Sequence, residues 1–239
     1  SFIRPDRHIP ARFVVINIGW AVITYGPSPA AYLDSAAHFY FRDEEIRIPH
    51  PYRDLYLQGE FLGAKRTLLE MEALVEAVAQ ARGAKVGLQD GSLILWGLPI
   101  TDDPDDISVR DYFLRPFLEA FQGLRERGIP VGSYLSLPQS KDVVNSLRVE
   151  ICDDDPVNCD KCSYIARRQK PICSRLAGVM DRQLFGFLKP GERSALFRSS
   201  SKILRVGYGE HRVYFFYLNA GQEIARVEVP EWVARDEEG

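Results

Sequence analysis

Asp90, Gly91 and Ser92 are the residues of this sequence whose types and spacing most clearly suggest chemistry. They follow residues 86–89, Val-Gly-Leu-Gln, which we interpret as a buried strand. A buried, unpaired carboxylate is costly, so Asp90 needs a partner, and a metal ion is a suitable one. Gly91 lets a ligand approach the backbone, and Ser92 can hydrogen-bond to the carboxylate or to the turn. The alternative is that Asp90-Gly91 is only a hairpin turn.

Two glutamates precede this strand on a predicted helix. Residues 60–82 carry apolar side chains at helical spacing and predict an amphipathic helix of about five turns. Glu70 and Glu72 fall on opposite borders of its apolar face. One of them could share a divalent ion with Asp90, because nucleases and phosphatases that use two metals draw carboxylates from separate elements. The same spacing also suits a solvated helix face.

The cysteines give a separate signal because all four fall within the irregular segment 150–175. Their clustering, with one C-x₂-C pair, suits a structural Zn²⁺ that would hold together a segment with too few apolar residues to fold alone. An iron–sulfur cluster and four unrelated free thiols are the alternatives. The residues are Cys152, Cys159, Cys162 and Cys173.

The elements that must position these residues indicate an α/β protein with one central sheet. Residues 13–25 predict a long bent strand or a hairpin, and residues 32–56 a loop with short pieces of strand. A helix is expected over residues 109–127, kinked or divided at Pro116, followed by a strand at 131–137.

Further along, Ser140 is expected to cap a helix over residues 141–148. A short helix is expected to begin near Asp181 and to end near Pro190. Three more strands are predicted by β-branched and aromatic runs separated by turn residues. They cover residues 201–208, 213–218 and 223–229.

Length and composition fit a globular protein that can bury a large core: 239 residues, 46% of them hydrophobic and 26% charged. A net charge of −3 neither supports nor excludes a DNA partner. No stretch approaches about 18 uninterrupted apolar residues and no leader is recognised, so we expect a cytoplasmic protein.

Several short segments, taken in order, are informative together. They are KRTLLEME at 65–72, LQDGSL at 88–93, YLSLPQSK at 134–141, SALF at 194–197 and EIARVEVP at 223–230. In this order they resemble the NurA nuclease family, most closely its longer bacterial members. The resemblance covers almost the whole chain, residues 1–239, with both ends incomplete and the cysteine-rich segment as an insertion.

This resemblance implies an RNase H-like fold, with a mixed central sheet flanked by helices. It implies a manganese-dependent, or magnesium-dependent, DNA exonuclease and single-strand endonuclease that works as a homodimer. It also implies partnership with a HerA-type hexameric translocase in the end resection of DNA double-strand breaks. The alternative from another class is a catalytically silent nucleic-acid-binding or adaptor module whose cysteine segment binds a partner.

Family members carry an aspartate in each of two Asp-Gly-Ser motifs, a glutamate on a helix between them, and a late histidine. Asp90 matches the second aspartate and Glu70 best matches the glutamate, with Glu72 also possible. Ser1 resembles the serine of the first motif, which puts its aspartate before this sequence and the histidine beyond Gly239. On this alignment the intact protein cuts DNA, whereas these residues alone do so poorly.

Four residues are candidates for contacting DNA. Lys141 could meet a phosphate as a point charge, although a lysine in the first turn of a helix is often simply solvated. Tyr134 and Tyr217 could each contact DNA or belong to the core. Ser92, two residues after Asp90, is the fourth candidate.

Overall fold

The computed structural model of the chain describes residues 13–83 and 85–235. The fold is mixed α/β with a mixed central sheet flanked by helices, which confirms the predicted class. The chain divides into two compact units. The first comprises the described residues of Ser1–Ser133, Ser200–Tyr214 and Glu228–Gly239, and the second comprises Tyr134–Ser199 and Phe215–Val227.

The largest sheet has five strands in the order β5-β6-β9-β8-β7. Three of the predicted strands, at 131–137, 213–218 and 223–229, are confirmed with small changes at their ends. The strands are β5 (Gly87–Asp90), β6 (Val131–Leu135), β7 (Phe197–Arg198), β8 (Val213–Asn219) and β9 (Ile224–Pro230).

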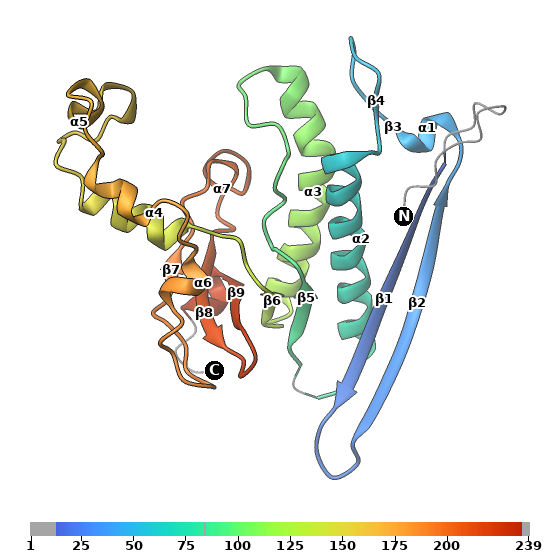
Figure 1. The fold of residues 1–239 in the computed structure, drawn as a ribbon. Coiled ribbons are helices and arrows are strands. Elements are labelled where there is room, and N and C mark those ends of the chain that lie inside the picture. The colour runs from blue at the N-terminus through green and yellow to red at the C-terminus, as the bar shows by residue number, and fades with distance from the viewer. Residues whose placement is uncertain (1–12, 84, 236–239) are drawn as a thin grey trace. The chain divides into compact units, whose positions relative to one another are not determined.

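The first unit begins with a long antiparallel hairpin, β1 (Val14–Thr24) and β2 (Ala30–Tyr40), paired from Val14↔Tyr40 to Thr24↔Ala30 (Figure 1). The expectation of a loop over residues 32–56 is therefore wrong for its first part. Cross-strand hydrogen bonds from β1 override the weak strand preference of the Ala, Asp and Ser residues in β2. Short elements follow: α1 (Asp43–Ile46), β3 (Arg47–Ile48) and β4 (Leu55–Tyr56).

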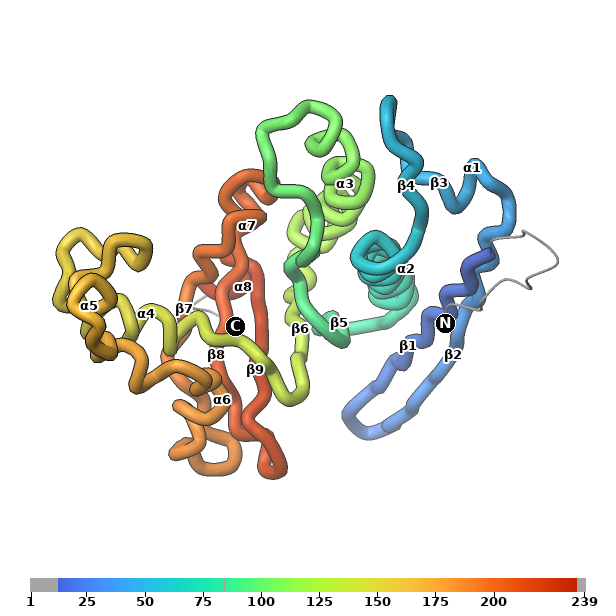
Figure 2. Tube along the Cα trace, turned by 45° about the horizontal axis from the view of Figure 1, so that its top comes forward, coloured from blue at the N-terminus to red at the C-terminus, as the bar shows by residue number. Residues whose placement is uncertain are grey.

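Helix α2 (Gly59–Gln80) confirms the predicted amphipathic helix and packs against β1, β5 and α3. Figures 1 and 2 show it running between α3 and the hairpin. Its buried side chains, with those of β1 and α3, form the core of the first unit. Because α2 contacts β5 directly, a polar residue on the border of α2 can reach the end of that strand.

Helix α3 (Pro104–Glu126) is one continuous helix, so Pro116 does not divide it. The helix also starts earlier than predicted, because Asp103 accepts a hydrogen bond from the Asp105 backbone N–H and Pro104 occupies the first turn. Phe113, Leu114, Phe117, Phe121 and Leu124 bury its apolar face.

One predicted strand is wrong: most of residues 201–208 form a helix, α7 (Lys202–Gly207). A short apolar run does not distinguish strand from helix by its period alone. Gly207 comes so close to Leu114 that a Cβ there would lie 2.6 Å from its Cδ2, so any larger residue would force the Leu114 side chain to move. The first unit ends with α8 (Glu231–Ala234).

The second unit contains α4 (Asp142–Glu150) and α6 (Asp181–Leu184), with three short helical turns between them. Helix α6 begins where expected but ends at Leu184, well before Pro190. A small cluster of Phe185, Leu188, Phe215 and Tyr217 forms the core of this unit. The intervening turns are η1 (Cys159–Lys161), α5 (Ser163–Ala166) and η2 (Ile172–Leu176).

Within the described part of the chain, none of the helices combines the length and the apolar character that crossing a lipid bilayer requires.

Candidate active site at the end of β5

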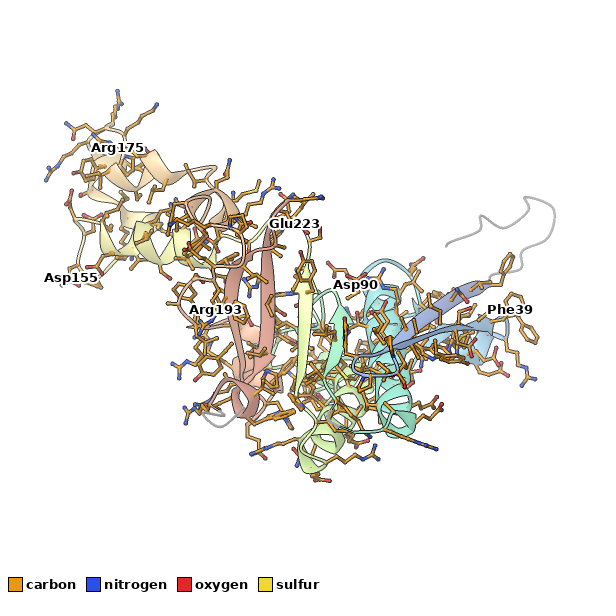
Figure 3. All side chains as sticks on the ribbon, turned by 90° about the horizontal axis from the view of Figure 1, so that it is seen from below. Phe39, Asp90, Asp155, Arg175, Arg193 and Glu223 are labelled. Atoms are coloured by element: carbon orange, nitrogen blue, oxygen red, sulfur yellow. The ribbon has the colours of Figure 1, made fainter. Side chains whose placement is uncertain are left out.

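Asp90 is the last residue of β5, and its side chain is exposed (Figure 3). The expectation of a buried strand with a buried Asp90 is therefore wrong. Side chains alternate along β5, so that Gly87 and Gln89 face the core while Leu88, 68% exposed, shares the outer face with Asp90. Burial thus does not force a partner on Asp90, and its role depends on which groups lie near it.

Glu70 of α2 lies near Asp90. Burial raises the pKa of the Glu70 carboxyl, Arg66 lowers it, and the negative charge of Asp90 raises it further. Glu70 Oε1 lies 3.4 Å from the Nε of Arg66, one turn earlier on α2. The effect of Asp90 on the pKa of Glu70 places the two carboxylates within electrostatic reach of each other. The contact between α2 and β5 thus leaves Glu70 within electrostatic range of Asp90, and a metal ion shared by the two carboxylates stays a prediction.

Glu72 lies on the other side of α2. Its side chain is exposed, and its charge, after burial, contributes to raising the pKa of Tyr40 on β2. Of the two candidate glutamates, Glu70 is the one whose pKa is affected by the charge of Asp90, whereas Glu72 affects the pKa of Tyr40 in the hairpin.

Gln89 is a residue of this site that the sequence reasoning missed. It is 4% exposed, and within the described residues neither its Nε2 nor its Oε1 has a hydrogen-bond partner. Its amide nevertheless lowers the pKa of Glu70, so it lies close to that carboxylate but outside hydrogen-bond geometry. An unpaired buried amide costs about 1–3 kcal/mol and is a donor and acceptor available to a ligand. Side chains along a strand point alternately to its two faces, and this alternation was the signal in the sequence that could have identified Gln89 as inward-facing.

The turn after Asp90 is held by Glu228 of β9, which is 1% exposed. Its Oε2 accepts hydrogen bonds from Ser92 Oγ at 2.8 Å and from the Leu93 backbone N–H at 2.9 Å. Gly91, which lies between Asp90 and Ser92, has a φ of 103°, and this backbone conformation strongly favours glycine. Glu228 therefore fixes the backbone that carries Asp90, and sequence reasoning did not single it out.

Ser92 serves the same turn. Besides donating to Glu228, its Oγ accepts hydrogen bonds from Ile94 N and from Trp96 Nε1, each at 3.0 Å. These contacts show a structural role for the hydroxyl, and a contact between Ser92 and DNA stays a prediction.

We expect Glu228→Ala to lower the free energy of unfolding by about 2–3 kcal/mol, because it leaves the buried Leu93 N–H without an acceptor. Urea denaturation measures this change. Glu119→Ala, on the exposed face of α3, is the matched control and should change stability by less than about 0.5 kcal/mol. Equal stability of the two variants would show that Glu228 does not hold the turn.

In the second unit, Tyr134 and Ser136 both donate to the carboxylate of Glu223. Tyr134 Oη lies 2.8 Å from Oε1, and Ser136 Oγ lies 2.7 Å from Oε2. The hydrogen bond to Glu223 raises the pKa of Tyr134. Lys141 is partly buried and directly precedes α4. A DNA contact by Tyr134 or Lys141 stays a prediction, and the phenol of Tyr134 already has a protein partner.

Asp181 is fully buried and stabilises the start of α4. Its carboxylate accepts hydrogen bonds from Val144 N at 2.8 Å, Val143 N at 3.2 Å and Tyr217 Oη at 2.6 Å. The expectation that Ser140 caps this helix is wrong, because its Oγ is bonded to Tyr217 Oη instead. Tyr217 is thus a core residue, which was one of its two predicted roles.

Among the described residues, no three His, Cys, Asp or Glu side chains lie close enough together to hold a metal ion. The four cysteines are free thiols. Ser1, aligned with the first Asp-Gly-Ser motif, lies outside the described residues.

Comparison with known proteins places the chain in a family. No curated protein and no solved structure matches it. A family model described as the NurA domain matches residues 1–239. The chain therefore belongs to the NurA family, a family of nucleases that act on DNA.

Proposed function

We propose that this protein hydrolyses the phosphodiester bonds of DNA, as an exonuclease and single-strand endonuclease, with Asp90 and Glu70 holding divalent metal. The observation that carries the proposal is the convergence of these two carboxylates from β5 and α2 in a chain of the NurA family. An RNase H-like arrangement of the sheet belongs to the same proposal.

The donor set suits a hard cation such as Mn²⁺ or Mg²⁺. Asp90 and Glu70 supply carboxylate oxygens, which are the ligands that such ions prefer. Mg²⁺ commonly uses one or two carboxylates and completes its shell with water and substrate phosphate. When bound, such an ion supplies an activated water and neutralises charge that develops on the phosphate.

The surrounding residues tune this pair. Glu70 must be ionised to bind a cation, and its pKa is raised by burial and by Asp90. An ordinary glutamate has a pKa of about 4.3. As the pH falls, Glu70 therefore becomes protonated, and metal binding is lost, at a higher pH than for such a glutamate. Arg66 partly neutralises Glu70, and its exposed guanidinium is available to a phosphate when a cation takes over that task.

The test is a nuclease assay on the full-length protein. We expect labelled single-stranded DNA to be degraded in the presence of Mn²⁺, and degradation to stop when a chelator is added. Mg²⁺ in place of Mn²⁺ identifies the preferred ion. DNA binding with no metal-dependent cutting would contradict the proposal and favour the adaptor module.

We further propose a homodimer that works with a HerA-type hexameric translocase in the end resection of double-strand breaks, in the cytoplasm. This part rests on family membership alone. Light scattering of the purified protein reports the dimer, and stimulation of cutting by the translocase and ATP reports the partnership.

A further inference from the structure

The segment between α4 and α6 has no hydrophobic core of its own. From residue 151 to residue 180 not one side chain is buried. Its regular structure consists of the short turns η1, α5 and η2, of which η2 packs on α4. Apolar burial is the main source of folding free energy, so a stretch of this length with none requires another source, such as a metal or disulfides.

All four cysteines of the chain line one small pocket in this segment. The pocket has a volume of about 30 Å³. Cys152 follows α4, Cys159 begins η1, Cys162 directly follows η1, and Cys173 lies in η2. Separate parts of an irregular chain thus contribute their thiols to the lining of one small pocket.

We propose that Cys152, Cys159, Cys162 and Cys173 bind one structural Zn²⁺ ion as a tetrahedral four-thiolate site. The sulfurs do not meet around a common point in this structure. Rotation about χ1 moves each Sγ without moving the backbone, so the ion can draw in thiols that already face the same pocket. In such a site each Sγ would lie about 2.3 Å from the zinc ion, so the four sulfurs must move closer together.

An iron–sulfur cluster is the main alternative for four clustered thiols, and metal analysis distinguishes it from zinc. The neighbouring carboxylate of Asp154 accepts a hydrogen bond from Ser163 N at 3.0 Å, at the start of α5, so it already has a structural partner. Four thiolates carry two negative charges more than Zn²⁺ neutralises. The segment also holds four aspartates, which its five basic side chains outnumber by one. The basic residues are Lys161, Arg167, Arg168, Lys170 and Arg175, the last of which is labelled in Figure 3 with Asp155 of the same segment.

Zinc would give this segment the cross-linking that its side chains do not provide. Binding of Zn²⁺ to four cysteines contributes directly to folding free energy. We therefore expect the segment to be ordered with zinc and to open without it, while the first unit, which has its own core, remains folded.

The first measurement is the metal content of the full-length protein, expressed with zinc and purified in reducing buffer without chelator. We expect one zinc per chain by elemental analysis, and loss of that zinc in Cys162→Ser. Asp160→Asn, inside the same C-x₂-C sequence, is the matched control and should keep its zinc. Replacement by Co²⁺ should give the intense visible absorption of a tetrahedral thiolate site.

Limited proteolysis provides a second readout that does not depend on nuclease activity. Trypsin cleaves after Arg167, Arg168 and Arg175, and we expect cleavage there to be at least about tenfold faster after zinc is removed, because the segment opens. Wild-type protein with four reactive thiols and no metal would overturn the proposal. So would disulfides detected by mass, or iron with the visible absorption of a cluster. The wild-type measurement decides the matter even if the serine variant fails to fold.

Discussion

Asp90→Asn should reduce metal-dependent cutting of single-stranded DNA by the full-length protein about 1,000-fold, with its fold unchanged. Several kcal/mol of charge stabilisation depend on the metal, and each 1.4 kcal/mol corresponds to tenfold in rate. Because Asp90 is exposed at the end of β5, replacing its carboxylate by an amide removes charge without disturbing the core. Initial rates of cleavage at saturating Mn²⁺ measure the loss, and thermal unfolding confirms the fold.

Asp102→Asn is the matched control, since it makes the same exchange at an exposed position outside the site and should cut at the wild-type rate. A readout independent of activity is the titration of the Glu70 carboxyl by NMR. Asp90 raises the pKa of Glu70, so Asp90→Asn should lower that pKa. If cutting and the pKa of Glu70 both stay at wild-type values, the two carboxylates do not form one site.

Asp181→Ala should lower the free energy of unfolding by about 3–4 kcal/mol, the largest stability loss we expect from a single carboxylate in this protein. The substitution leaves two backbone N–H groups of α4 and the hydroxyl of the buried Tyr217 without their acceptor. Urea denaturation followed by circular dichroism measures the change.

Asp181→Asn keeps the shape and one acceptor oxygen, and should lose about half as much. Asp160→Asn tests an exposed aspartate of the same unit and should stay within about 0.5 kcal/mol of wild type. A small effect of Asp181→Ala would mean that water replaces the carboxylate and that α4 does not depend on this cap.

The long, strongly periodic elements were predictable from the sequence. Helix α2 and strands β1, β8 and β9 occur within a few residues of their predicted ends because their apolar periods are unambiguous. Strand β2 was missed because its order comes from pairing with β1 rather than from its own side chains. Helix α7 was taken for a strand because a short apolar run fits both periods.

The elements that carry the two candidate carboxylates were predictable from the sequence, but the residues that support them were not. Glu70 lies on a helix and Asp90 at the end of a strand, as expected, although the burial assigned to Asp90 was wrong. Glu228 was missed because its role depends on the strand order, which puts β9 next but one to β5, and Gln89 was missed because its role depends on which face of β5 is covered. Neither property follows from local sequence, since both are set by tertiary contacts.

The hydrogen bond between Ser92 and Glu228 joins residues 136 positions apart in the chain. Contacts of such long range form late, because the entropy of closing a large loop must be overcome first. During synthesis, a ribosome must therefore release strand β9 before the turn that carries Asp90 can settle. Synthesis adds about 5–20 residues per second, so several seconds pass between the synthesis of Ser92 and that of Glu228. A nascent chain in that interval therefore lacks the hydrogen bond that fixes the turn carrying Asp90.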